Sequence, residues 1–355
     1  MVGFVGPRSP RSLLAGSLKV CLIFLLFGAS RLFAQQGFAQ QGLTSISAEV
    51  KRVFDQAKNA VVRIQAEDEH GRLAGTGFFI DPDGTIFTAY EVGGESWDII
   101  VEFGSSRYPA ERLVADPRSG IAVLKVSAGT PWLSTGDSDE LKLASPVVTI
   151  GYPMDLSVTP SFGMIGGFDL KYLNQYFSTT LIRANIAAQR GEAGSPVLNL
   201  KGEVVGILIF PIDNRTACYA LPIKAAEKVH TDYVRFGEVR PGWVGVSVVA
   251  AEERVHDSTA VIQSFAEGSP AADSGLQQGD VLLSIGSISV HSPPDVVNAS
   301  FFLTAEQDVP ITVCRDGKVV TVTVTAGDRP GIVQQKFPLF APANLENILR
   351  TKDRE

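Results

Sequence analysis

Residues 191–207 read GEAGSPVLNLKGEVVGI, with two glycines flanking Glu192 and Ala193. Around this stretch, short apolar runs alternate with turn residues from about residue 60 to residue 205. Examples of these runs are residues 61–64, 99–103 and 147–150. Many short strands separated by regular turn signals are typical of an all-β barrel or sandwich. We therefore predict a mainly β fold for this part of the chain.

Residues 182–207 resemble the nucleophile region of the HtrA/Deg family of secreted serine proteases, whose loop reads GNSGG. Ala193 stands where the family has its serine. In residues 75–92, GTGFFIDPDGTIFTAYEV, Glu91 stands at the family's general-base histidine. In residues 116–124, DPRSGIAVL, Gly120 stands at the aspartate that orients this histidine. The resemblance implies a chymotrypsin-like double β-barrel, with barrels near 60–128 and 140–222, whose three triad positions are all replaced.

These replacements remove the groups that peptide hydrolysis needs. An alanine methyl group cannot attack a carbonyl, and a serine needs an adjacent base with a pKa near the working pH. The Glu91 carboxylate, with a reference pKa of about 4.3, is a weak base near neutral pH. We therefore expect no catalytic residue and predict an inactive homologue of a serine endopeptidase. The backbone N–H groups of Gly191 and Ala193 would remain as a residual oxyanion hole.

Two ways of recovering catalysis stay open at this point. Ser195 lies two residues beyond the lost nucleophile and could replace it, although that shift moves its hydroxyl several ångströms. Glu91 and Glu192 could form a carboxylate pair, because paired carboxylates perform acid–base or metal chemistry. The competing interpretation is that Glu192 is a solvated loop residue and Glu91 a tolerated replacement. We expect no metal and no cofactor.

The C-terminal part resembles a PDZ domain. Residues 223–236 have apolar side chains at helical spacing, and Gly237 is a suitable helix terminator. Residues 269–276, SPAADSGL, and 279–285, GDVLLSI, resemble PDZ motifs of the same family. A helix is expected to begin near Pro293, and residues 313–324 are expected to form the closing hairpin.

A PDZ domain binds peptides without a catalytic triad. The resemblance implies that the loop Trp243, Val244, Gly245 and Val246 holds a C-terminal carboxylate through backbone N–H groups, while the peptide adds a strand to the sheet. The first side-chain pocket would be lined by Val246, Val248, Val297 and Phe301. The alternative for these four apolar residues is ordinary core packing.

Composition narrows the classes of partner. The 355 residues carry a net charge of −7 and no long basic run beyond the N-terminus, which argues against a nucleic-acid partner. Residues 1–34 resemble a secretory signal, with a basic start and an apolar run at 20–29. We expect export, to the periplasm if the resemblance holds, or membrane anchoring if the segment is not cleaved. Only Cys218 and Cys314 follow this segment, so no disulfide framework is expected.

The predicted organisation is a signal at 1–34, a flexible leader at 35–44, a double β-barrel at 45–237, a PDZ domain at 238–330 and a tail at 331–355. At the start of the 45–237 segment, residues 47–59 are predicted to form a short amphipathic helix with Val50, Phe54 and Ala57 on one stripe. The resemblance also implies a possible homotrimer joined by aromatic residues near the start of the first barrel, and Phe38 or Phe54 could serve in this role. Phe54 could equally be a core residue of its helix.

Two functional hypotheses from different classes follow. The first is a non-catalytic HtrA/Deg-like protein that binds C-terminal peptides or unfolded proteins through its PDZ domain. It would act as a scaffold, a holdase or a regulator of an active family relative in envelope protein quality control. The second is an active serine-type endopeptidase, or another hydrolase using non-standard residues at the old cleft.

Overall fold

The computed structural model describes residues 45–172, 175–212 and 216–328, as well as residues 1 and 3. Apart from these two, the predicted signal and leader, with Phe38, lie outside the described residues, as does the predicted 331–355 tail. A helix covers residues 45–57 and continues as the 3-10 turn η1, Lys58–Ala60. Of the predicted stripe, Ala57 is buried while Val50 and Phe54 are partly buried, and Val53 is buried beside them. Phe54 is half-buried, with the Lys58 ammonium 5.3 Å from its ring centre.

The first barrel is a seven-stranded antiparallel sheet with the order β5-β4-β1-β2-β3-β7-β6. Its elements are β1 Val61–Asp68, β2 Gly71–Phe79, β3 Thr85–Ala89, α2 Tyr90–Gly93, β4 Trp97–Phe103, β5 Ser106–Pro109, β6 Glu111–Asp116 and β7 Ile121–Lys125. Aromatic side chains fill its core, and the Phe78 and Phe87 rings meet edge to face at 6.1 Å. Such aromatic pairs stabilise a core beyond their area of burial.

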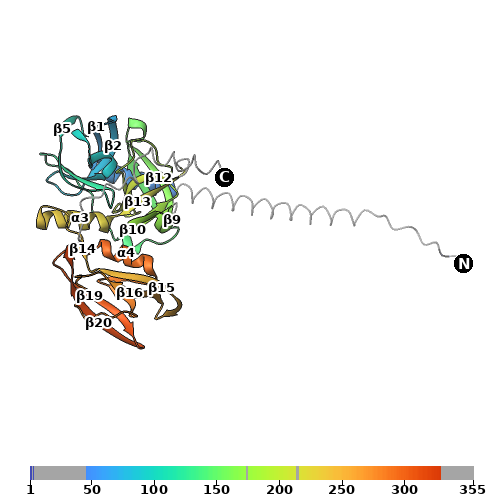
Figure 1. Ribbon diagram of the computed structural model, residues 1–355. Helices are drawn as coiled ribbons and strands as arrows, with labels where there is room; N and C mark the ends of the chain where they lie inside the picture. The colour runs from blue at the N-terminus through green and yellow to red at the C-terminus, as the bar shows by residue number, and fades with distance from the viewer. Residues whose placement is uncertain (2, 4–44, 173–174, 213–215, 329–355) are drawn as a thin grey trace, which may run out of the picture. The chain divides into compact units, whose positions relative to one another are not determined.

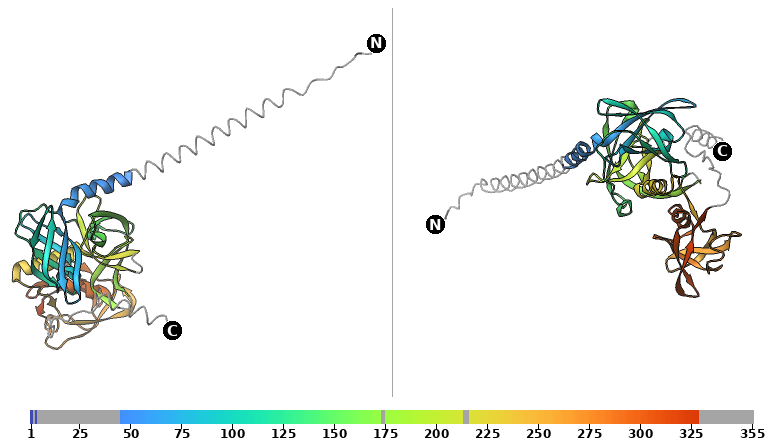
Figure 2. Two further views of the ribbon diagram at one scale, coloured as in Figure 1. Left: turned by 90° about the horizontal axis from the view of Figure 1, so that it is seen from above. Right: turned by 90° about the vertical axis from the view of Figure 1, so that its left-hand side faces the viewer.

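The second barrel is closed, with the strand order β10-β13-β12-β11-β8-β9. Its elements are β8 Pro146–Gly151, β9 Thr159–Tyr172, β10 Gln175–Ala184, β11 Pro196–Leu198, β12 Val204–Ile212 and β13 Ala217–Pro222, with the 3-10 turns η2 Ser138–Glu140 and η3 Pro153–Asp155. Seen from above, the two barrels lie side by side (Figure 2). Cys218 is buried in β13 with a free thiol.

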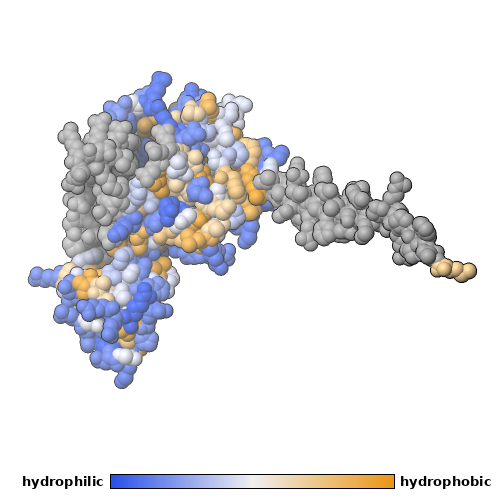
Figure 3. All heavy atoms as spheres, turned by 90° about the vertical axis from the view of Figure 1, so that its right-hand side faces the viewer, coloured by the Kyte–Doolittle hydropathy of each residue, from blue (hydrophilic) through white to orange (hydrophobic). Residues whose placement is uncertain are grey.

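The outer surface of the second barrel is partly apolar. Phe162, Met164 and Phe168 alternate along β9 with buried residues and are exposed. Figure 3, seen from the side on which β9 lies in Figure 1, shows apolar surface gathered over the barrels. The period-2 geometry of a strand thus presents apolar side chains to solvent as well as to the core.

Helix α3, Ile223–Phe236, confirms the helix predicted for these residues. It ends at Gly237, whose φ of 76° is left-handed and favours a residue without a Cβ atom. Figure 1 shows α3 crossing between the barrels and the C-terminal domain. Its residue Asp232 is buried and accepts hydrogen bonds from Lys228 Nζ at 2.6 Å and Thr304 Oγ1 at 2.9 Å.

The C-terminal domain has the α+β fold expected for a PDZ domain. Its elements are β14 Gly242–Trp243, β15 Val246–Val255, β16 Ser258–Phe265, β17 Val281–Ile285, β18 Ile288–Ser289, α4 Pro293–Phe301, β19 Asp308–Arg315, β20 Lys318–Thr325 and β21 Gly327–Asp328. The main sheet has the order β15-β16-β17-β19-β20, with β18 paired to β17. Helix α4 begins at Pro293, as predicted, and Ser292 and Asp295 form a capping box there.

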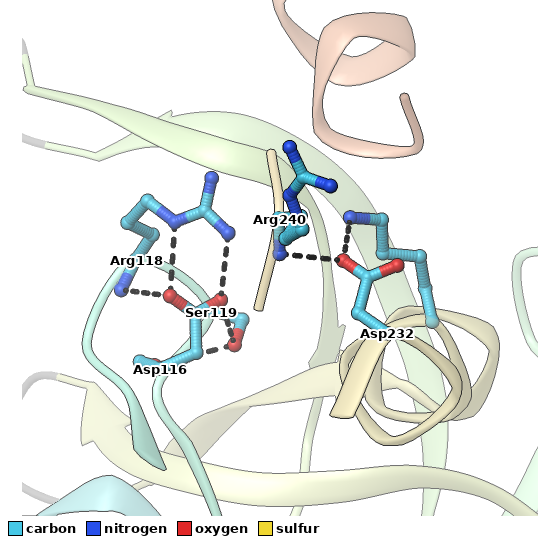
Figure 4. A network of polar contacts seen from close by, with 6 residues as sticks. Asp116, Arg118, Ser119, Asp232 and Arg240 are labelled. Atoms are coloured by element: carbon cyan, nitrogen blue, oxygen red, sulfur yellow. Dashed lines mark hydrogen bonds and ion pairs between the residues drawn. The ribbon is translucent and has the colours of Figure 1, made fainter. Parts of the chain in front are cut away.

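Helix α4 also packs against the second barrel. Asn298 Oδ1 accepts hydrogen bonds from Thr179 Oγ1 and the Thr180 amide, both at 2.9 Å. Figure 4 draws two further groups of polar contacts, one within the Asp116–Ser119 turn and one in which the Arg240 amide donates to Asp232 of α3. Polar contacts therefore connect the C-terminal domain to β10 and to α3.

We predict that Asp232→Ala lowers the free energy of unfolding by about 3 kcal/mol, because it leaves the Lys228 ammonium buried without its charge partner. The matched control is Glu67→Ala, which removes the partner of Arg72, an exposed side chain. Exposed ion pairs contribute about 0–1 kcal/mol, so the control should change little. Denaturant unfolding measures both, and equal losses in the two variants would contradict the prediction.

Candidate functional site

Glu91 lies in α2, the single helical turn that follows β3. The Tyr90 amide donates to the Gly120 carbonyl at 2.7 Å, which fixes α2 against the turn before β7. The Glu91 side chain keeps contact with solvent, but the surrounding protein atoms partly desolvate its carboxyl and raise its pKa. The position predicted to correspond to the family's histidine thus carries a partly desolvated carboxyl group.

The Gly120 turn is built for a residue without a side chain. Its φ is 81°, and a Cβ atom at this position would lie 2.9 Å from Ile209 Cγ2. An aspartate here would be strained in its backbone and would meet an apolar side chain. In the same turn, the Asp116 carboxylate accepts from Arg118 Nε at 2.9 Å and Ser119 Oγ at 3.0 Å (Figure 4).

The 189–195 loop of the second barrel is held by Thr76 of the first. The Thr76 amide donates to the Ala193 carbonyl at 2.9 Å, and its hydroxyl donates to the Gly191 carbonyl at 2.7 Å. A Cβ atom on Gly194 would lie 2.9 Å from the amide nitrogen of Ala89 in β3. The structure therefore brings the loop of Ala193, the α2 turn of Glu91 and the Gly120 turn together where the two barrels meet.

Glu192 is not a solvated loop residue, as one interpretation of the sequence had it. Its side chain is only 3% exposed, and its Oε2 accepts a hydrogen bond from the Gln189 amide at 2.7 Å. Burial raises the pKa of its carboxyl, and the Gln189 hydrogen bond opposes this shift in part. Burial, together with the charge of Glu192, also raises the pKa of the Cys218 thiol to about 12. The Glu192 carboxyl thus belongs to the interior of the second barrel.

Ser195 is also fully buried, and its Oγ has no hydrogen-bond partner among the described residues. Its φ is not positive, so the replacement of a family glycine causes no backbone strain there. The amides of Gly191 and Ala193 donate to no acceptor within the described ranges. These two N–H groups are the atoms predicted to form a residual oxyanion hole.

In the C-terminal domain, the predicted carboxylate-binding loop lies between β14 and β15. Trp243 ends β14, and the carbonyls of Val244 and Gly245 accept from the amides of Ala271 and Ala266, both at 2.9 Å. Gly245 has a φ of 80°, and a Cβ atom there would lie 2.2 Å from Ser269 Cβ. The carbonyls of the loop thus accept hydrogen bonds from within the domain. The close approach of Ser269 leaves no room for a side chain at position 245.

The four residues of the predicted pocket separate into two groups. Val246 and Val248 on β15 are half-buried against the domain core, and Val297 on α4 is 42% exposed. Phe301 lies elsewhere: its ring centre is 5.8 Å from Arg118 Cζ and 6.0 Å from Lys228 Nζ, both outside the C-terminal domain. Although Val297 and Phe301 are one helical turn apart, the aromatic ring at the end of α4 packs toward these cations.

Sequence reasoning missed three residues that position the site: Thr76, Ile209 and Asn298. A signal existed for Thr76, because it lies between two glycines whose close contacts exclude side chains. A Cβ atom on Gly75 would be 2.3 Å from Val92, and one on Gly77 would be 2.7 Å from Ile64. Such packed glycines indicate that β2 approaches its neighbours closely.

Within the described residues, no group of three His, Cys, Asp or Glu side chains is arranged to hold a metal ion. The described helices include none with the length and apolar character needed to cross a membrane.

Comparison with known proteins assigns both parts of the chain. A model of the trypsin-like peptidase domain matches residues 75–207, and a model of the PDZ domain matches residues 242–326. A probable periplasmic serine endoprotease, DegP-like, from Halomonas elongata is 33% identical over 280 residues, covering 75% of this chain and 59% of that protein. Its counterpart from Chlamydia pneumoniae is 30% identical over 273 residues, covering 73% and 56%. The chain therefore spans less than two thirds of the length of these curated relatives.

Solved structures show the same fold. The HtrA-type protease AlgW with tripeptide has a TM-score of 0.66 at 24% identity, covering 79% of this chain and 97% of that chain. The serine endoprotease from Yersinia pestis has a TM-score of 0.57 at 22% identity, covering 79% and 98%. These similarities confirm the predicted fold class, a chymotrypsin-like double β-barrel followed by a PDZ domain.

The buried carboxyl of Glu192 predicts a pH dependence of stability. Because its pKa is raised in the folded state, the folded protein binds this proton more tightly, and stability falls as pH rises from the unfolded pKa through the folded one. Glu192→Gln keeps an acceptor for the Gln189 amide and cannot ionise. We expect this variant to be more stable than the wild type at pH 8, with the difference shrinking on acidification.

Thermal unfolding at several pH values measures this effect. The matched control is Glu91→Gln, which replaces a carboxyl that keeps contact with solvent. At pH 8 it should raise the stability less than Glu192→Gln does. A Glu192→Gln variant whose advantage over the wild type does not depend on pH would contradict the assignment.

Proposed function

We propose that this HtrA/DegP-like protein, with a trypsin-like peptidase domain followed by a PDZ domain, binds polypeptides without cleaving them. Its ligands are C-terminal peptides or unfolded protein tails, bound through the PDZ domain. It acts as a scaffold, a holdase or a regulator of an active relative. The names of its relatives support a periplasmic location, and thus a role in envelope protein quality control.

The observation that carries this proposal is the convergence of Glu91, Gly120 and Ala193 at one place between the barrels. Contacts of Tyr90 with Gly120, of Thr76 with Ala193 and of Gly194 with β3 bring these three positions together. A triad works as a unit, because the serine needs a base and the base needs an orienting carboxylate. At these three positions the chain has the methyl group of Ala193, the carboxyl of Glu91 and Gly120, which has no side chain.

The routes to recovered catalysis find little support in the geometry. Ser195 is fully buried, so its hydroxyl cannot reach a substrate from outside. Glu192 is occupied by the Gln189 amide inside the second barrel, whereas Glu91 keeps contact with solvent. A carboxylate pair acting on one substrate needs both groups at the same cleft.

The PDZ domain supplies the binding activity. Residues 243–246 form a loop whose amides can hold a terminal carboxylate, and β15 is an edge strand of its sheet. A peptide can therefore add as a further strand beside β15, with its last side chain near Val246, Val248 and Val297. The proposed groove omits Phe301, which packs against Arg118 and Lys228.

The competing function is hydrolysis. The relatives are named serine endoproteases, and this favours an active enzyme. The raised pKa of Glu91 also favours it, because a general base is most effective when its pKa lies near the working pH. An enzyme of this kind would have to activate water without a protein nucleophile at position 193.

We expect the purified protein to cleave neither casein nor any denatured substrate, and to remain unlabelled by a fluorophosphonate probe for activated serines. Ala193→Ser alone should restore nothing, because no imidazole would accept the proton. Glu91→His, Gly120→Asp and Ala193→Ser together should also fail while Ile209 fills the space beside residue 120. Adding Ile209→Ala to these three opens that space, and only this combination should recover turnover.

A wild-type turnover that persists in the Glu91→Gln variant would point to contaminating protease. Turnover that is lost in this variant would establish the hydrolase and overturn the proposal.

We expect a hydrophobic peptide with a free C-terminus to bind with micromolar affinity, about −8 kcal/mol, and its C-terminal amide to bind far more weakly. Gly245→Ala should weaken binding by about tenfold, on the order of 1.4 kcal/mol, because the new methyl group displaces the loop from Ser269. Calorimetry measures both effects. The control is Gly268→Ala, which shares a positive φ of 66° but has no atom within 4 Å of its Cβ position. Equal affinity for free and amidated peptides would rule out the groove.

A further inference from the structure

Strand β20 is an open edge of the PDZ sheet. Within the described residues it pairs with β19 alone, at the end of the sheet opposite β15. In an antiparallel pair only alternate residues bond to the neighbouring strand, so the others direct their N–H and C=O groups to the open edge. Figure 1 shows the β19–β20 hairpin on the side of the domain away from the barrels.

Beyond Lys318, its first residue, this edge lacks the features that usually prevent strand pairing. Residues 319–325 read VVTVTVT, without charge, proline or glycine. The β19–β20 register is continuous from the Asp308–Thr325 pair to the Arg315–Lys318 pair, so no bulge twists the edge away. Val319 is 58% exposed, and Thr321 and Thr323 are exposed on the same face. Val and Thr are strong strand formers, and such an edge is a template for another strand.

The sequence of this edge is its own complement. Residues 320–324 read VTVTV, which is identical in both directions. An antiparallel pair centred on Val322 places Val320 opposite Val324 of a second copy, and Thr321 opposite Thr323. Within residues 320–324 each valine then meets a valine on the core-facing side, and each threonine meets a threonine on the exposed side. At either end of the pair, Val319 meets Thr325. A two-fold axis repeats each of these contacts, as a symmetric dimer requires.

We propose that two copies of this chain associate through β20, forming one continuous sheet across a two-fold axis centred on Val322. A second copy is the occupant that the sequence favours, because this edge is its own complement and residues 319–325 carry no charge, although the net charge of −7 opposes self-association elsewhere on the surface. Copies that repel each other elsewhere meet here without like charges in contact. The inference goes beyond the proposed function, since it depends on neither the peptide groove nor the old protease site.

Size-exclusion chromatography with light scattering tests the proposal on the chain without residues 1–34, over a micromolar dilution series. Thr321→Lys with Thr323→Lys places like charges opposite each other across the axis and should halve the molar mass. Thr321→Glu with Thr323→Lys places each Lys opposite a Glu of the second copy and should restore the wild-type mass. Ser247→Lys on β15 adds one charge to the opposite edge and should leave the mass unchanged.

Four outcomes would overturn the proposal. They are a monomeric wild type, a wild-type mass in the double lysine variant, a failure of the Glu/Lys variant to restore the mass, and dissociation caused by Ser247→Lys. A monomeric full chain beside a dimeric chain ending at Asp328 would show that the C-terminal tail, and not a second copy, takes the edge. Circular dichroism of each variant verifies that a change in mass is not a loss of folding.

Discussion

A single buried threonine joins the two barrels at the candidate site. Thr76 donates its amide to Ala193 and its hydroxyl to Gly191, and it accepts a hydrogen bond from the Tyr152 amide at 3.1 Å. Because Thr76 is fully buried, loss of its hydroxyl would leave the Gly191 carbonyl and the Tyr152 amide without this partner, at about 1–3 kcal/mol each. The loop at 189–195, the turn at Tyr152 and strand β2 therefore depend on one another, whatever side chain stands at position 193.

Backbone packing sets the shape of this loop more than side-chain chemistry does. Gly191 and Gly194 have φ values of 93° and 88°, where most side chains are strained. A Cβ atom on Gly191 would lie 2.4 Å from the Tyr152 carbonyl, and one on Gly194 would lie 2.0 Å from the Thr76 carbonyl. A loop held in this way owes its geometry to backbone contacts, so the proposed loss of the nucleophile leaves the shape of the loop unchanged.

The sequence predicted the features that depend on neighbours along the chain. The helix at 223–236 with Gly237 and the hairpin of β19 and β20 follow from apolar periodicity and turn residues, which act over a few positions. Glu192, Ile209 and Phe301 escaped prediction because distant segments determine their surroundings. Glu192 is buried by the folding of the barrel, and Phe301 meets Arg118 across some 180 positions of sequence. The domain boundaries and the roles of the site residues stay predictions.

The contact between Gly120 and Ile209 has an evolutionary consequence. If Gly120→Asp occurs before any change at 209, the aspartate has a strained backbone and meets the apolar Ile209 side chain. The substitution is therefore unfavourable as the first of the two. A smaller residue at 209 alone leaves a cavity in a buried position, at about 2–5 kcal/mol for Ile→Ala. Each step is costly unless the other has already occurred, so the two positions are epistatic. An aspartate at 120 is therefore accommodated only together with a smaller side chain at 209, and the free energies of the two substitutions are not additive.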